Sequence, residues 1–173
     1  MLRGNNLKQL YLPYNFYTML QRIQSIYLLF ASLVLFALFF FPLAHNVYVD
    51  SKPVSVMVTG IFQDMNGTQQ YTEHFTALTA ITAIVALVPL VIIFLYKNRK
   101  QQIAICYSAI LVLIGYSFWM AQTVKKAIGS VQLDSRTMGI GLFLTSLSIV
   151  LLILAAKSIQ RDEKLVKSAD RLR

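Results

Sequence analysis

Four long stretches of this sequence contain no charged residue at all. No Asp, Glu, Lys, Arg or His occurs in residues 23–43, 75–96, 103–122 and 138–156, each 19 to 22 residues long. At a rise of about 1.5 Å per residue, a helix of that length crosses a hydrocarbon core of roughly 30 Å. The absence of charge therefore predicts four membrane-spanning helices. It agrees with a composition that is 57% hydrophobic and only 13% charged.

The same absence limits the chemistry available inside the membrane. Proton and ion transport normally needs an ionisable side chain within the bilayer, and these stretches have none. The single cysteine, Cys106, excludes an intramolecular disulfide or a redox pair, and we interpret it as a small apolar filler of the third span. No Ser-His-Asp set, HExxH motif, phosphate loop or nucleotide fingerprint occurs either. We therefore expect no enzyme activity, and we assign no catalytic, cofactor or metal residue.

Histidine is scarce, and its two positions leave one alternative open. His45 follows the first stretch and His74 precedes the second, so both are expected near the outer surface, where they could approach each other. Two histidines could ligate a metal or haem, but the sequence suggests no third ligand. We favour ordinary polar residues at the membrane interface.

The basic residues that are present lie beside the spans. With both termini in the cytoplasm, twelve Lys and Arg fall on the cytoplasmic side and four on the outer side. Because Lys and Arg are retained on the cytoplasmic side, this predicts an N-in, C-in topology. Lys125 and Lys126 are the exception, and they either snorkel or meet an acidic partner. Contact with anionic lipid headgroups explains the net charge of +9 better than nucleic acid does.

The two ends of the chain differ from the spans. Residues 1–18 are polar and aromatic without a helical stripe, which predicts a flexible leader and leaves Met19 as an alternative start to Met1. The first stretch is too long for a signal peptide and favours a retained anchor. Residues 19–173 then form one four-helix membrane domain. Its tail, residues 157–173, continues the fourth helix as a basic amphipathic segment that lies on the membrane or meets a cytoplasmic partner.

One extramembrane segment is long enough to fold. Residues 44–74 are rich in β-formers, and Asn66-Gly67 is a strong two-residue hairpin signal. We predict that this β-hairpin loop forms a small antiparallel sheet on the outer side, which serves either as a docking surface or as a cap over the helix ends. The predicted fold class is therefore an all-α membrane protein, a four-transmembrane-helix bundle with this loop between helices 1 and 2.

Proline and small residues shape the predicted bundle. Pro89 lies inside the second span, where its ring removes a helical hydrogen bond and frees the carbonyl of Val85. We interpret the resulting kink as a packing feature, with a gate as the alternative. Small residues recur at helical spacing in three of the spans, which favours one compact bundle.

Three segments together resemble a known family. They are Met19–Leu29, the turn Lys97–Gln102 and the closing segment Arg161–Arg173. Together they resemble the small four-span bacterial inner-membrane proteins catalogued as domain of unknown function 4293. The resemblance covers residues 19 to 173 and implies four spans with a cytoplasmic tail. It brings no catalytic or ligand residues.

These observations predict a function at the ends of the spans. We expect a non-enzymatic accessory or scaffolding subunit of a larger complex in the bacterial inner membrane. The alternative is an oligomeric carrier for a lipid or a small apolar molecule. The expected partners are anionic membrane lipids and either a membrane protein or a second copy, without nucleic acid. The residues expected to contact a partner or lipid headgroups are Arg22, Asn98, Arg99, Lys100, Asp162, Glu163, Asp170 and Arg171. Their other interpretation is charge that sets the topology.

Overall fold

The computed structural model describes residues 14–49, 52–65, 68–96, 98–129 and 137–170, and they form four helices and one small sheet. The helices are α1 (Tyr14–Ala37), α2 (Thr76–Phe94), α3 (Arg99–Ile128) and α4 (Ile140–Asp170). The strands are β1 (Ala44–Val49), β2 (Lys52–Val56), β3 (Gly60–Met65) and β4 (Thr68–His74). The predicted fold, four apolar helices with an antiparallel sheet between the first two, is confirmed.

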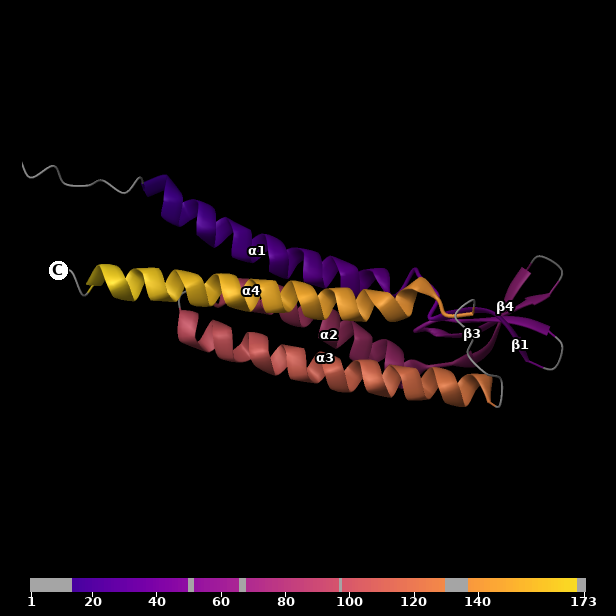
Figure 1. Ribbon diagram of the computed structural model, residues 1–173. Helices are drawn as coiled ribbons and strands as arrows, with labels where there is room; N and C mark the ends of the chain where they lie inside the picture. The colour runs from indigo at the N-terminus through magenta and orange to yellow at the C-terminus, as the bar shows by residue number, and fades with distance from the viewer. Residues whose placement is uncertain (1–13, 50–51, 66–67, 97, 130–136, 171–173) are drawn as a thin grey trace, which may run out of the picture.

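The helices lie lengthwise beside one another, with the sheet at one end (Figure 1). The first residues of α1, the turn between α2 and α3, and the end of α4 lie at the opposite end. α4 packs against both α1 and α3, and α1 packs against α2. Of the neighbouring helix pairs, α2 and α3 pack least closely. This looser seam is where a cavity lies.

Three helices are long and apolar enough to cross a membrane, over Thr76–Phe94, Arg99–Ile128 and Ile140–Leu165. α1 contributes a shorter apolar segment, Ile23–Ala37. The first span was expected to continue to Leu43, but α1 ends at Ala37. A proline disfavours helical geometry in the residue before it, and Pro42 follows closely. The chain instead turns, and the Leu43 N–H donates to the Val56 carbonyl of β2.

The expected leader, residues 1–18, falls mostly outside the described residues. Residues 1–13 are not described, while Tyr14–Thr18 form the beginning of α1. The helix therefore begins before Met19.

The sheet has strand order β1-β2-β3-β4, and all neighbours are antiparallel. Met65 pairs with Thr68 across the predicted Asn66-Gly67 turn, whose own residues lie outside the described ones. The loop is therefore a four-stranded antiparallel meander, which agrees with the predicted small antiparallel sheet. The additional pairings bury Val47, Val54 and Val56.

A short ladder ties the sheet to the start of α4. The His45 N–H donates to the Thr137 carbonyl at 3.0 Å, and the Gly139 N–H donates to the Leu43 carbonyl at 2.9 Å. Ala44 and Met138 form an antiparallel bridge. Gly139 is required here because a Cβ would overlap the carbonyl oxygen of Pro42. The ladder fixes the sheet against the end of the bundle.

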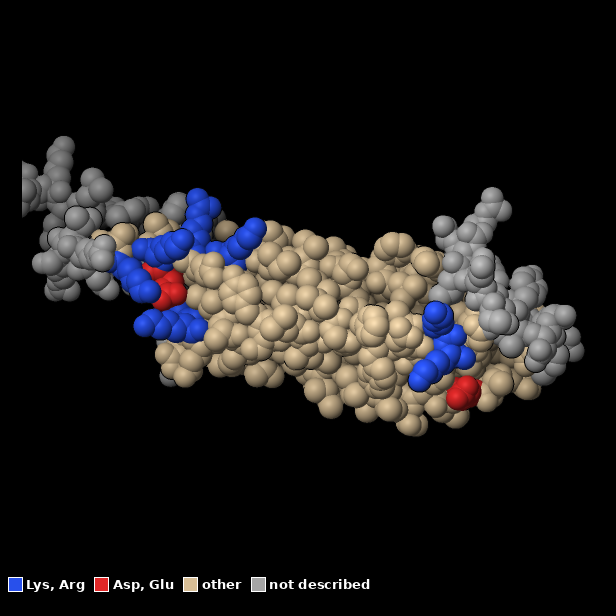
Figure 2. Space-filling view, turned by 60° about the horizontal axis from the view of Figure 1, so that its bottom comes forward, with Lys and Arg blue, Asp and Glu red and all other residues tan. Residues whose placement is uncertain are grey.

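In the part of the chain that the structure describes, charged side chains lie at the two ends of the molecule. On the face that Figure 2 shows, Lys and Arg lie at both ends and the long middle carries no charged side chain. The large side chains exposed in the middle are apolar, among them Ile84, Leu111, Phe118 and Phe143. An exposed apolar belt between two charged ends is the surface expected of a membrane-spanning bundle.

Candidate functional site

At the end of the bundle away from the sheet, three helices meet at one carboxylate. Asp162 of α4 is only 5% exposed. The Gln24 Nε2 of α1 donates to its Oδ2 at 2.8 Å, and the Arg99 Nη1 of α3 lies 3.4 Å from the same oxygen. We call these three residues the Asp162 cluster. It links α1, α3 and α4 through polar contacts.

The helical repeat explains why these side chains face inward. Gln24 precedes the buried Leu28, Ala31 and Leu35 at spacings of three and four, so it lies on the core face of α1. Asp162 follows the fully buried Ile159 by three residues on α4. Both polar residues therefore continue an apolar stripe by one turn. That signal was available in the sequence, but it does not reveal that the two stripes face each other.

A second buried amide belongs to Gln102, three residues after Arg99 in the sequence. The Gln102 Nε2 donates to the Ile92 carbonyl at 3.1 Å, which also accepts the Leu95 N–H at 3.2 Å, so the amide adds a second hydrogen bond at the end of α2. The turn itself carries an exposed pair, in which the Asn98 Nδ2 donates to the Gln101 Oε1 at 3.1 Å. One buried amide thus holds the α2–α3 turn, while the outer side chains of the turn remain accessible.

The exposed surface at this end of the bundle, the end away from the sheet, is basic. Lys100, Lys157, Arg161 and Lys164 are exposed, and we call these four residues the basic surface. Glu163 lies 2.7 Å from Lys167 one helical turn away. Among the acids of this end that the structure describes, Asp162 and Glu163 are both paired within the chain.

The predicted contact residues are only partly brought together. Arg99 and Asp162 form an ion pair, and Asp162 is buried rather than presented to a partner. Asn98 and Lys100 are exposed on the turn, and Glu163 is partly buried on α4. Arg22 and Asp170 lie within α1 and α4, and their side chains are outside what the structure describes, as is Arg171. Gln24 was missed by sequence reasoning, because it carries no charge and lies within an apolar run.

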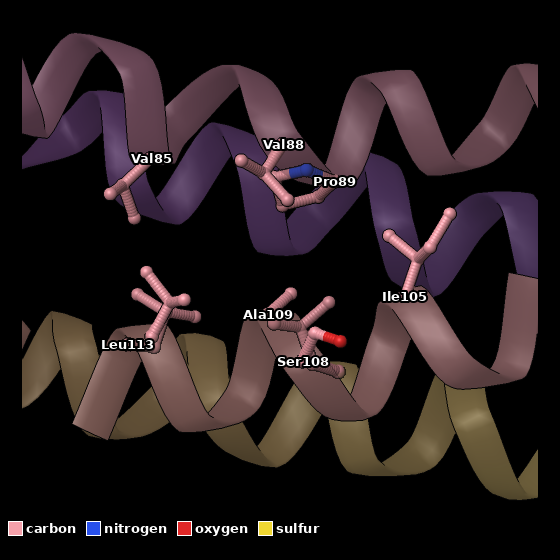
Figure 3. A pocket seen from close by; sticks show the side chains of 9 residues that line it. Val85, Val88, Pro89, Ile105, Ser108, Ala109 and Leu113 are labelled. Carbon is pink, nitrogen blue, oxygen red and sulfur yellow. The ribbon is translucent and has the colours of Figure 1, made fainter. Parts of the chain in front are cut away.

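A cavity of about 150 Å³ opens between α2 and α3 in the uncharged middle (Figure 3). It is lined by Val85, Val88, Pro89, Ile105, Ser108, Ala109, Val112, Leu113 and Leu152. Its one hydroxyl, from Ser108, donates to the Ala104 carbonyl of its own helix at 2.9 Å. The cavity therefore offers apolar surface and no free polar group from these side chains.

The helix around Pro89 is supported by a neighbour. The Ser32 Oγ of α1 donates to the Ala86 carbonyl at 2.7 Å, next to the carbonyl of Val85 that proline leaves without its helical donor. The adjacent helix α1 thus forms a hydrogen bond with α2 one residue after the carbonyl of Val85. Other buried hydroxyls also join helices: the Ser148 Oγ donates to the Ala31 carbonyl, and the Thr82 and Tyr116 hydroxyls lie 2.6 Å apart.

The histidines expected to approach each other lie on opposite edges of the sheet. His45 belongs to β1 and His74 to β4, and β2 and β3 lie between them. Neighbouring strands are about 4.8 Å apart, so this arrangement separates the two side chains well beyond a shared metal ion. His74 instead stacks on Tyr71, with ring centroids 4.7 Å apart. Among the described residues, no group of three or more His, Cys, Asp or Glu is placed to hold a metal.

Comparison with known families gives one match. A sequence model described as a domain of unknown function, DUF4293, matches residues 20–172. The match covers the sheet, α2, α3, α4 and α1 from residue 20 onward, and it confirms the resemblance predicted from the three segments. No curated protein matches the chain.

Proposed function

The chain belongs to the DUF4293 family, and on that premise we propose that it is a non-enzymatic accessory subunit of a larger complex in the bacterial inner membrane. The observation that supports this most is the basic surface at the end of the bundle away from the sheet. There Lys100, Lys157, Arg161 and Lys164 are exposed, while Asp162 and Glu163 are paired within the chain.

An excess of positive charge at a rigid end of the bundle favours the docking of a partner. The Asp162 cluster links α1, α3 and α4 beneath the basic surface, so the exposed cations are held on a fixed scaffold. A partner with a complementary acidic segment would gain orientation and association rate from such a field. Anionic headgroups are the other source of complementary charge, at about 1 kcal/mol for each basic residue near the membrane.

The proposed topology places both termini and the basic surface in the cytoplasm. The twelve-to-four distribution of Lys and Arg supports it, and the first residues of α1 and the last residues of α4 lie on the side of the bundle away from the sheet (Figure 1). We expect a green fluorescent protein fused to the C-terminus to fluoresce and alkaline phosphatase fused there to be inactive. The opposite pair of results would reverse the topology.

Co-purification tests the docking function. The full chain is purified with a tag in mild detergent, and bound proteins are identified and quantified by mass spectrometry. We expect a stoichiometric larger partner that is retained by wild type and lost in the triple variant Lys157→Gln, Arg161→Gln, Lys164→Gln. The double variant Lys125→Gln, Lys126→Gln removes charge from the other end of α3 and should retain the partner. Homo-oligomers that carry only lipid in every variant would contradict docking.

The cavity beside Pro89 favours a second candidate function, an oligomeric carrier for a lipid or a small apolar molecule. Its lining is apolar and it opens at the loosest helix seam. Transfer of a fluorescent lipid between donor and acceptor vesicles, with and without the reconstituted protein, tests this function. A transfer rate equal to that of protein-free vesicles would exclude it.

A further inference from the structure

We propose that the groove between α2 and α3 binds one acyl chain of an anionic phospholipid, whose headgroup rests on the turn that joins these helices. The inference rests on the cavity of the second candidate function but not on transport. If the protein binds the lipid but does not transfer it between vesicles, the proposed site stands and the carrier function is excluded.

The cavity has the lining and size of an acyl-chain site. Val85, Val88 and Pro89 project from α2 toward Ile105, Ala109 and Leu113 of α3 (Figure 3). An apolar cavity of this size does not hold water, so hydrocarbon is the natural occupant. A water-sized group takes roughly 30 Å³ in a liquid, so about 150 Å³ holds on the order of five methylene groups.

The mouth of the cavity faces the membrane rather than the interior of the bundle. Val112 lines it and is 54% exposed, and Ser108 beside it is also exposed. Leu152 of α4 is fully buried and belongs to the same lining. The surrounding middle of the molecule is uncharged (Figure 2). A hydrocarbon chain can therefore enter from the side.

The rim of the groove favours a flexible chain over another helix. Close approach of helices in lipid depends on small residues that let backbones come together. Here branched side chains of Val88, Ile105 and Val112 line the groove on both sides. They would keep a second helix backbone away, whereas a single acyl chain fits between them.

The depth of the cavity matches one leaflet. At about 1.5 Å per residue, Ile105 lies roughly 3 Å and Leu113 roughly 15 Å along α3 from Ile103, where the uncharged stretch begins. One leaflet contributes about half of a roughly 30 Å core. A lipid whose headgroup lies at the α2–α3 turn thus places its acyl chain beside the cavity.

The turn supplies contacts that suit an anionic headgroup. Because it joins α2 to α3, it lies at the end of the groove between them. Asn98 and Gln101 expose amide groups there, and Arg99 is one-third exposed. Lys100 is exposed and forms no ion pair with any carboxylate in the described part of the chain. Amide donors and two cations match the oxygens and charge of a phosphodiester.

Native mass spectrometry of the full chain tests the acyl-chain site. The protein is reconstituted in vesicles of equal parts phosphatidylglycerol and phosphatidylethanolamine, extracted in mild detergent, and its bound lipids are counted. We expect wild type to retain phosphatidylglycerol in several-fold excess over phosphatidylethanolamine. Ser108→Phe fills the mouth and should lower total retained lipid several-fold. Leu111→Phe, at a position of α3 that is 71% exposed and does not line the cavity, is the matched control and should bind as wild type does.

A second filling variant and a headgroup variant complete the test. Val112→Phe should act as Ser108→Phe does, so that misfolding of one variant still leaves the test decisive. Lys100→Gln should abolish the preference for phosphatidylglycerol while total lipid falls less, and Lys126→Gln should change neither. Equal lipid retention by the filling variants and Leu111→Phe would overturn the proposal. So would a lipid-free dimer that Ser108→Phe converts to monomer, or a preference that survives Lys100→Gln.

Discussion

Gln24 and Asp162 are separated by 138 positions in the sequence, yet the Gln24 Nε2 donates a hydrogen bond to the Asp162 Oδ2 at 2.8 Å. The bond connects the beginning of the apolar part of α1 to the charged end of α4. Because Asp162 is nearly inaccessible to solvent, its carboxylate depends on partners from the chain itself. Gln24 and Arg99 are those partners.

Replacing Gln24 should destabilise the bundle. In Gln24→Leu, the buried Asp162 carboxylate loses its shorter hydrogen bond and keeps only the more distant Arg99. Loss of one hydrogen bond to a buried charged group costs about 1.5–3 kcal/mol, so the thermal midpoint of the detergent-solubilised protein should fall. Gln122→Leu changes an exposed glutamine at the other end of α3 and is the matched control. Equal midpoints for both variants would show that the bond contributes nothing to stability.

The pairing of Arg99 with Asp162 should be detectable as a coupling energy. Arg99→Gln leaves the buried carboxylate without a cation, and Asp162→Asn removes the charge that needs one. The double variant should therefore be more stable than the two single changes predict when added. Because one-third of Arg99 is exposed, we expect a coupling of about 1 kcal/mol rather than the larger values of fully buried pairs. Unfolding measured for all four proteins in one detergent checks this, and strictly additive effects would contradict it.

Two glycines should respond in opposite directions to the same substitution. In Gly139→Ala the new methyl group would overlap the carbonyl oxygen of Pro42, so the ladder between β1 and the start of α4 must open. We expect a strong loss of folded protein. Gly115 lies within α3, where a methyl group added to its Cα would meet no other atom within 4 Å, and alanine there should add about 0.8–1 kcal/mol through helix propensity. Yield after gel filtration and the thermal midpoint distinguish the two, and similar behaviour would be inconsistent with the close contact at Pro42.

Removing one hydroxyl from the core should increase stability. Among the described residues, the Thr145 Oγ1 is the buried side-chain polar atom without a hydrogen-bond partner. Thr145→Val keeps the shape of the side chain and replaces the unpaired hydroxyl by a methyl group, which should raise stability by about 1 kcal/mol. Ser148→Ala is the contrast, since its Oγ donates to the Ala31 carbonyl, and it should lower stability. A lower thermal midpoint for Thr145→Val would indicate that the hydroxyl has a function in the folded protein.

Much of the architecture could be predicted because it depends on local pattern. Runs of uncharged residues longer than a bilayer is thick predict helices regardless of their neighbours, and Asn66-Gly67 predicts the pairing of the strands on either side of it. The family resemblance was likewise visible in three short segments. The end of α1 was predicted wrongly because the apolar run continues past Ala37 to Leu43, although Pro42 disfavours a helix there and Leu43 bonds to β2.

The candidate sites were less predictable because each needs contacts between distant segments. Asp162 was expected at the surface with the other charges of the tail, and the structure buries it against Gln24. His45 and His74 were expected to approach each other, and the strand order keeps them on opposite edges of the sheet. Pro89 was recognised, but the cavity beside it requires Ile105, Ala109 and Leu113 from another helix.

The sequence by itself determined that this protein has four apolar helices, with its charges gathered at their ends, because hydrophobic length and charge are properties of single segments. Only the tertiary structure decided which helices are neighbours and where their packing is loose. The burial of Asp162 and the cavity beside Pro89 both follow from that arrangement of the helices. Helical periodicity indicates which face of a helix is apolar, but it does not indicate which other helix packs against that face.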